Sequence, residues 1–148
     1  MARAETGKVM HLVHESEFLA VDLEIVSRFG LAELLQAFGQ GVSVNRNEKV
    51  GRLHVLLLSV DSMTRVQRNP ENHLNAVIQA VVEKVGSLPV SLRRHWDTSK
   101  TKTFDIGIQA GKHPMSLELK ISEQTLAAMV RIGARLQVTV YGASAVAR

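Results

Sequence analysis

Apolar residues alternate with polar residues in several short segments of the chain, and a period of two is typical of strands with one solvated face. In the segment 18–27, Val21, Leu23 and Ile25 share one parity, and acidic residues occupy the other. The segment 52–59 is apolar on both faces toward its end, as expected for a central strand. The same pattern predicts further strands at 42–45, 103–109, 116–121 and 136–141.

Helical spacing of apolar residues recurs in three other segments. These lie between Gly30 and Gly39, from Asn69 to Gly86, and from Ser122 to Gly133. Asn69 followed by Pro70 strongly predicts the start of a helix. The asparagine side chain can accept hydrogen bonds from the free backbone amides of the first turn, and proline fits in that turn. Ser122 is the predicted N-cap of the third helix. Residues 91–96 are predicted to be a short irregular or helical piece.

The predicted elements follow one another in the order β-α-β-β-α-β-β-α-β. Because several strands keep a polar face that needs solvent, this order predicts an α+β fold: a mixed, mainly antiparallel sheet of about five to six strands with two to three helices on one face. The strands 103–109 and 116–121 flank a turn that contains glycine and proline, and they are predicted to form a hairpin. The predicted buried sheet face comprises Phe104, Ile106, Ile108, Leu117, Leu119, Val138 and Val140.

A chain of 148 residues has the length of one domain. We expect a single α+β domain over 9–141, a disordered stretch at 1–8 and a flexible tail at 142–148, because both ends carry too little apolar surface to offset the entropy of ordering. No export signal is visible, cysteine is absent, and no apolar run approaches the roughly 20 residues of a membrane span. The sequence therefore predicts a cytoplasmic protein without a membrane partner.

Residues that catalyse reactions or hold metals in other proteins are scattered along this chain. The absence of cysteine excludes thiolate catalysis and cysteine-ligated zinc. His11 and His14 lie three residues apart, but no further ligand follows at a metal-binding spacing. No Gly-x-Ser-x-Gly or phosphate-cradling glycine pattern occurs, and Asp105 is interpreted as an ion-pair partner rather than an acid catalyst. The sequence thus predicts no catalytic residue, no metal and no cofactor, and a protein that is not an enzyme.

Basic residues exceed acidic ones by 18 to 14, and the excess lies in the last two thirds of the chain. The isoelectric point of about 9.8 favours acidic partners. The densest polar cluster places Arg93, Arg94, Lys100 and Lys102 around Trp96, and we interpret these four cations as a surface that grips a carboxylate-rich partner. The alternative is that Trp96 packs in the core while the arginines stay solvated.

A pattern of framework residues covers 88–141. It comprises Trp96-Asp97, the run from Phe104 to Gly111, Leu117-Glu118-Leu119, a helix that ends in Gly133-Ala134 and a strand that ends in Tyr141. This pattern resembles the domain-of-unknown-function 4279 family of small bacterial domains. The resemblance implies an α+β domain, a bacterial source and, because such domains often neighbour toxins, an immunity role. It implies no role for any particular residue.

The leading hypothesis is a non-enzymatic protein-binding module, in the form of a bacterial immunity protein that neutralises a cognate toxin by meeting an acidic patch on it. The alternative is a nucleic-acid or nucleotide-binding domain, which the high isoelectric point also favours. Salt separates these hypotheses, because nucleic-acid affinity falls steeply with salt, whereas a protein complex with a buried anchor shows mainly a salt-dependent association rate. The sequence predicts no oligomeric state.

Overall fold

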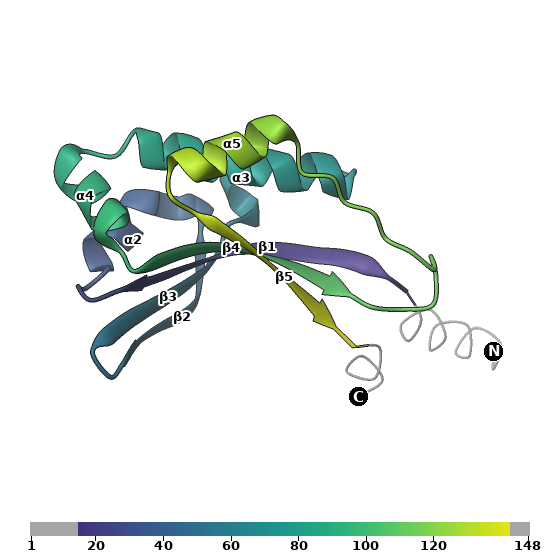
Figure 1. The fold of residues 1–148 in the computed structure, drawn as a ribbon, viewed down its shortest axis with the longest axis horizontal. Helices are drawn as coiled ribbons and strands as arrows, with labels where there is room; N and C mark the ends of the chain where they lie inside the picture. The colour runs from purple at the N-terminus through teal and green to yellow at the C-terminus, as the bar shows by residue number, and fades with distance from the viewer. Residues whose placement is uncertain (1–14, 143–148) are drawn as a thin grey trace.

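Five strands form one sheet in the computed structural model of the protein, which describes residues 15–142 (Figure 1). The strands are β1 (Glu17–Ser27), β2 (Ser43–Val50), β3 (Leu53–Ser59), β4 (Thr101–Gln109) and β5 (Arg135–Tyr141). The helices are α2 (Ala32–Phe38), α3 (Pro70–Gly86), α4 (Val90–Thr98) and α5 (Glu123–Arg131), with short 3-10 turns at Gly39–Gly41 and Asp61–Met63. The disorder predicted for 1–8 and the tail predicted for 142–148, apart from Gly142, lie outside the described residues.

The strand order across the sheet is β2-β3-β1-β4-β5. β1 is central and pairs antiparallel with both β3 and β4, while β2 and β3 form an antiparallel hairpin. β4 and β5 are parallel, because the chain crosses over through α5 between them. The α+β class and a mixed, mainly antiparallel sheet are therefore confirmed, while the described part of the chain has four α-helices rather than two to three.

All four helices cover the same face of the sheet (Figure 1). Every second side chain of the three inner strands points at these helices. The fully buried ones include Val21, Leu23, Ile25, Leu56, Leu58 and Phe104. The two predicted N-caps are confirmed: the side chain of Asn69 accepts from the backbone nitrogen of Asn72 at 3.0 Å, and that of Ser122 accepts from the backbone nitrogen of Thr125 at 3.1 Å. Within the described residues, no helix has the length and apolar character needed to cross a membrane.

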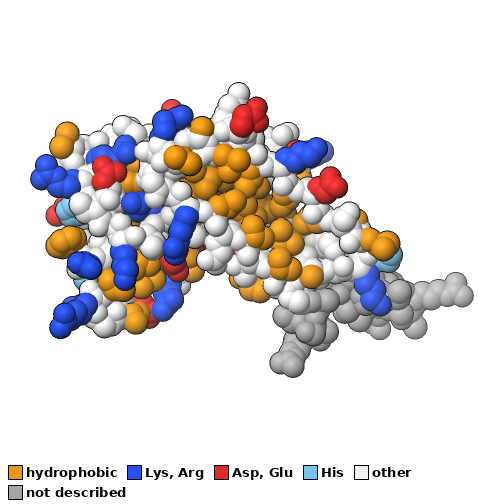
Figure 2. Space-filling view, viewed as in Figure 1, with side chains coloured by type: hydrophobic (Ala, Val, Ile, Leu, Met, Phe, Trp, Pro, Cys, Tyr) orange, Lys and Arg blue, Asp and Glu red, His pale blue; other side chains and the backbone are white. Residues whose placement is uncertain are grey.

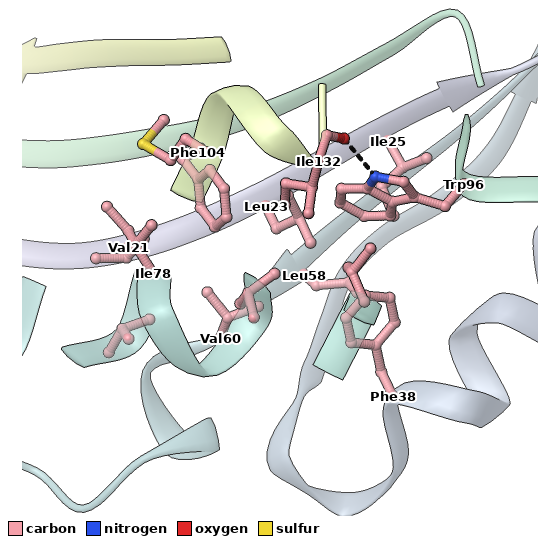
Figure 3. Close-up of a cluster of buried hydrophobic side chains, with 14 of the residues drawn as sticks. Val21, Leu23, Ile25, Phe38, Leu58, Val60, Ile78, Trp96, Phe104 and Ile132 are labelled. Carbon is pink, nitrogen blue, oxygen red and sulfur yellow. Dashed lines mark hydrogen bonds between the residues drawn. The ribbon is translucent and has the colours of Figure 1, made fainter. Parts of the chain in front are cut away.

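Trp96 has no exposed surface and lies among the buried side chains drawn in Figure 3. Its indole Nε1 donates to the backbone oxygen of Ile132 at 2.7 Å, and its ring centroid lies 6.3 Å from that of Phe38. A single side chain of α4 thereby joins α2 to the residue that follows α5. Of the two roles considered for Trp96, the structure shows the core role, so this indole is not an exposed anchor for a partner.

The predicted hairpin of 103–109 with 116–121 is wrong. β4 is already paired on both sides, with β1 and with β5, so it has no free edge for another strand. Residues 110–122 instead run as an irregular connection from β4 to α5, in which Leu117 and Leu119 remain partly buried. The element order is therefore β-α-β-β-α-α-β-α-β.

Two other elements differ from prediction in their extent. The strand predicted at 42–45 continues to Val50, so only Gly51 and Arg52 are left for the turn to β3. Gly51 has a φ of 61°, a left-handed conformation that favours glycine at this tight turn. The piece predicted at 91–96 is a regular helix, α4.

The predicted buried sheet face is confirmed on β4 and wrong on β5. Phe104 and Ile106 are buried, and Ile108 is partly buried against the core. Val138 and Val140 lie beside Ile106 and Ile108 in the strand register, yet they are 52% and 60% exposed. They are exposed because β5 is an edge strand, which has a neighbouring strand on one side only.

Candidate functional site

The four cations predicted to bind a partner lie in different environments. Arg94 on α4 and Lys100 before β4 are exposed. Arg93 is half-buried and forms an ion pair with Asp97 one helical turn further on, with Nε 3.0 Å from Oδ1. Lys102 is only 8% exposed, because its parity on β4 points it toward the helices. Arg94 and Lys100 are thus available to a partner, whereas the Lys102 side chain does not lie on that surface.

Lys102 covers the end of the core instead. Its Nζ lies 6.0 Å from the centroid of the Trp96 ring, which is a cation–π distance. Burial lowers the pKa of Lys102, the carboxylate of Asp97 raises this pKa, and the guanidinium of Arg93 lowers it. We therefore assign Lys102 a structural role beside Trp96.

Exposed cations gather at one end of the sheet, which we call the basic end. β1 ends there, β2 turns into β3 there, and β4 and β5 both begin there. The basic end comprises Arg28, Lys49, Arg52, Arg94, Lys100, Arg131 and Arg135. Figure 2 shows blue side chains gathered on the left of the molecule, over α4 and the β2–β3 hairpin.

These cations are available to a partner. None of these cations forms an ion pair within the described part of the chain, where the ion pairs involve Arg46, His73 and Arg93. Arg135 donates through Nε to the hydroxyl of Thr103 at 2.8 Å, which holds its side chain at the start of β5. Phe29 follows Arg28 in the loop after β1 and is 61% exposed. The basic end therefore combines positive charge with an exposed aromatic ring.

His73 and Asp61 have the residue types of a catalytic pair but are occupied by structural contacts. Nε2 of His73 donates to Oδ1 of Asp61 at 2.9 Å, and Nδ1 accepts from the backbone nitrogen of Gln67 at 3.4 Å. Asp61 also accepts from the backbone nitrogen of Val21 at 3.2 Å. Because the ring is buried and both its nitrogens are engaged, the pair fastens the connection between β3 and α3 to β1 and leaves no nitrogen for a substrate.

On the face of the sheet without helices, Asp22 on β1 and Asp105 on β4 lie opposite each other. Burial, with added repulsion from Asp61 and Asp105, raises the pKa of Asp22 to about 6. The two carboxylates border a hollow of about 420 Å³ that Tyr141 also lines. Asp105 accepts a hydrogen bond from the hydroxyl of Thr139 at 2.8 Å, and the ion pairs of the described residues do not include it, so the ion pair predicted for Asp105 is not found there. The described residues hold no group of three or more potential metal ligands, and two carboxylates with a phenol do not by themselves define a reaction.

Sequence reasoning identified Arg94 and Lys100 and missed the rest of the basic end. The missed cations are spread along most of the chain, from Arg28 to Arg135. Each stands at or next to the end of a strand or helix, and strand pairing brings those ends together. Phe29 was missed for the same reason.

Comparisons with protein-family models, with curated proteins and with solved structures give no match. The resemblance over 88–141 therefore stays a prediction, and the surfaces described above are the basis of the function proposed below.

Proposed function

We propose that the protein is a non-enzymatic protein-binding module whose basic end binds an acidic surface on another protein. The observation that supports this proposal is the basic end itself, where exposed Arg and Lys side chains from several strands and helices meet without ion-pair partners among the described residues. Such a surface steers an oppositely charged partner and raises the association rate by about 10- to 1,000-fold at low salt.

Phe29 supplies the apolar contact that charge alone lacks. Its exposed ring stands in the loop after β1, and Lys100 lies beside this loop because its backbone nitrogen donates to the oxygen of Val26 at 2.7 Å. An aromatic side chain that becomes buried, surrounded by polar and charged residues, is the usual composition of an interface hot spot. The proposed interface therefore places Phe29 at its centre and the cations around it.

Immunity against a cognate toxin is the narrower form of this function. In that form the basic end covers an acidic surface of the toxin and blocks access to it. This narrower proposal rests on the resemblance over 88–141, whereas the proposal of protein binding rests on the surface.

Binding of nucleic acid or a nucleotide is the second candidate, and Phe29 is the observation that favours it. Phosphates pair with exposed Arg and Lys, and an exposed ring stacks on a base. Proteins that bind single strands, however, stack successive bases on several aromatic rings. Among the described residues, Phe29 is the aromatic side chain that the basic end exposes, which favours the protein partner.

The two candidates are separated by titrating the protein into two labelled probes of equal charge, a polyglutamate peptide and an oligothymidylate, at several salt concentrations. One double variant reverses charge at the basic end, Arg94→Glu with Lys100→Glu. A matched control, Lys112→Glu with Lys120→Glu, makes the same change in net charge at exposed positions of the opposite end. We expect the first to weaken polyglutamate binding about 10-fold or more and the control less than about 3-fold.

Other results would overturn the proposal. Equal weakening by both double variants would mean that binding follows net charge and not the basic end. The other result is tighter binding of the oligothymidylate than of polyglutamate, with a steep salt dependence and a further loss of affinity in Phe29→Ala. It would show that the partner is nucleic acid rather than protein.

A further inference from the structure

Exposed apolar side chains gather along one edge of the sheet, away from most of the basic end. We call this surface the β5 edge; it comprises Leu126 and Val130 of α5 with Leu136, Val138 and Val140 of β5. Their exposure ranges from 38% for Leu136 to 75% for Val130. Figure 2 shows orange side chains gathered in the middle of the molecule, over α5 and β5. Contiguous apolar patches on soluble domains mark binding surfaces, so the β5 edge needs an occupant.

The backbone of β5 offers unpaired groups on its outer side. The backbone oxygen of Tyr141 accepts from the nitrogen of Ala110 at 2.9 Å, so this residue directs its polar groups toward β4. Successive residues of a strand direct their backbone groups to opposite sides, and those of Leu136, Val138 and Val140 therefore point outward. The residues with outward backbone groups are the same ones whose apolar side chains face the helix side.

We propose that two copies of this chain associate through their β5 strands, paired antiparallel across a two-fold axis at Val138. This register pairs all seven residues of each strand, with Leu136 opposite Val140 and Val138 opposite itself. Apolar side chains then meet apolar side chains on one face, and the outward backbone groups form about six hydrogen bonds. The two sheets become one continuous sheet with the helices of both copies on the same side.

Charge supports a second copy as the occupant. Arg135 is the one charged residue of β5, and the proposed register places it opposite Tyr141 of the other copy. The strand therefore meets itself without opposing like charges, as a two-fold interface requires. A strongly acidic partner, by contrast, would place its carboxylates against valine and leucine over most of this edge.

The surface available is consistent with a reversible dimer. In two copies, the β5 edge and Tyr141 expose on the order of 1,000 Å², which is near the lower limit for specific protein interfaces. We therefore expect a dissociation constant of about 1–10 μM.

Sedimentation velocity tests the proposal over concentrations from about 1 to 200 μM, which bracket the expected dissociation constant. Val138→Lys places two ammonium groups opposite each other at the axis, and we expect it to weaken the dimer at least about 100-fold. Val44→Lys is the matched control, because Val44 is 49% exposed on the same face of the other edge strand, β2. We expect this control to leave the dimer unchanged, and thermal melts to show that both variants fold.

The absence of cysteine allows a second test with single-cysteine variants. Under mild oxidation, Val138→Cys should form a disulfide between copies, since directly opposite residues of an antiparallel pair lie about 5.5 Å apart at Cα. Val44→Cys should stay reduced under the same conditions.

Three results would overturn the proposal. The first is a wild-type protein that remains monomeric at about 200 μM, which would leave the β5 edge to a different partner. The second is a dimer that Val138→Lys does not weaken, and the third is a dimer weakened equally by Val44→Lys. The proposal is independent of the basic end, because Arg94→Glu with Lys100→Glu leaves the β5 strand unaltered and should leave dimerisation unaltered too.

Discussion

The two edges of the sheet meet solvent with opposite chemistry. β2 carries Arg46, Glu48 and Lys49, and a bulge between Val44 and Arg46 shifts its pairing with β3. β5 carries Arg135 as its one charge and pairs with β4 without a shift in register. Charges and bulges on an edge strand discourage pairing with another chain. β2 is therefore a protected edge and β5 an open one.

The polar sides of the two edge strands differ as well. On β5, Thr139 and Gln137 both donate to the carboxylate of Asp105 on the neighbouring strand, at 2.8 and 3.3 Å. On β2, Arg46 donates to Glu48 of its own strand. Among the described residues, side-chain hydrogen bonds thus join β5 to β4, whereas the side-chain hydrogen bond of β2 stays within β2. A strand held in register is the better template for a second strand, which supports the contrast between an open and a protected edge.

The largest expected change in stability tests whether the apolar side chains of β5 are part of the core. Ile106 on β4 and Val138 on β5 are neighbours in register, but Ile106 is buried and Val138 is half exposed. Ile106→Ala should lower the free energy of unfolding by about 2–5 kcal/mol, because it leaves a cavity. Val138→Ala should cost less than about 0.5 kcal/mol. Urea denaturation, at protein concentrations below the dimer dissociation constant, measures both changes. Similar losses of unfolding free energy in the two variants would mean that Val138 is part of the core.

This pair of residues also shows what the sequence could not reveal. Alternation of polar and apolar residues identified the β5 strand and the face of Val138 correctly, because strand period is local information. Whether that face is covered depends on the position of the strand in the sheet, which no local pattern encodes. The same limit explains the wrong strand at 116–121, whose alternation is real but whose intended partner β4 is already paired on both sides. The caps at Asn69 and Ser122 were predictable because capping needs only the next three residues.

The candidate site was less predictable than the fold. Arg94 and Lys100 were found because they lie close together in the sequence, and Lys102 was included although its parity on β4 buries it. The remaining cations of the basic end come together only through strand pairing. Surface sites of this kind therefore need the topology before their members can be named.

The second prediction concerns the fastening of β5 to the sheet. Thr139→Val removes the hydroxyl that donates a hydrogen bond to Asp105. It should lower the free energy of unfolding by about 1–2 kcal/mol, because a hydrogen bond to a charged group contributes more to stability than one between neutral groups. Thr139→Ser keeps the hydroxyl and is the control. Chemical denaturation of both variants decides the matter, and equal stability of the two would show that β5 is held by its backbone alone.

A third prediction lies between the edges, at the centre of the open face. The pKa of Asp22 is raised from 3.8 to about 6, so its contribution to stability is complete below pH 3.8 and is lost as pH rises through 6. Asp22→Asn cannot ionise and should be more stable than wild type at pH 7, by about 1 kcal/mol after allowance for solvent screening. Below pH 4 the difference should vanish. Thermal melts across this range measure it, and a gain of equal size at both pH values would contradict the assigned cause.

The smallest expected change in stability is also the sharpest test of the contrast between the two edges. Arg46→Thr with Glu48→Thr removes an exposed ion pair and should alter the free energy of unfolding by less than about 0.5 kcal/mol. Its effect on association should be much larger, because β2 then becomes a second open edge. A β5–β5 dimer closes on itself, whereas pairing of β2 with β5 is heterologous and continues from copy to copy. We therefore expect light scattering that grows with time and concentration in this variant, and not in the charge swap Arg46→Glu with Glu48→Arg, which keeps both charges. If the threonine variant remains as soluble as wild type, the bulge next to Val44 or the remaining Lys49 protects β2, and the pair of Arg46 and Glu48 does not.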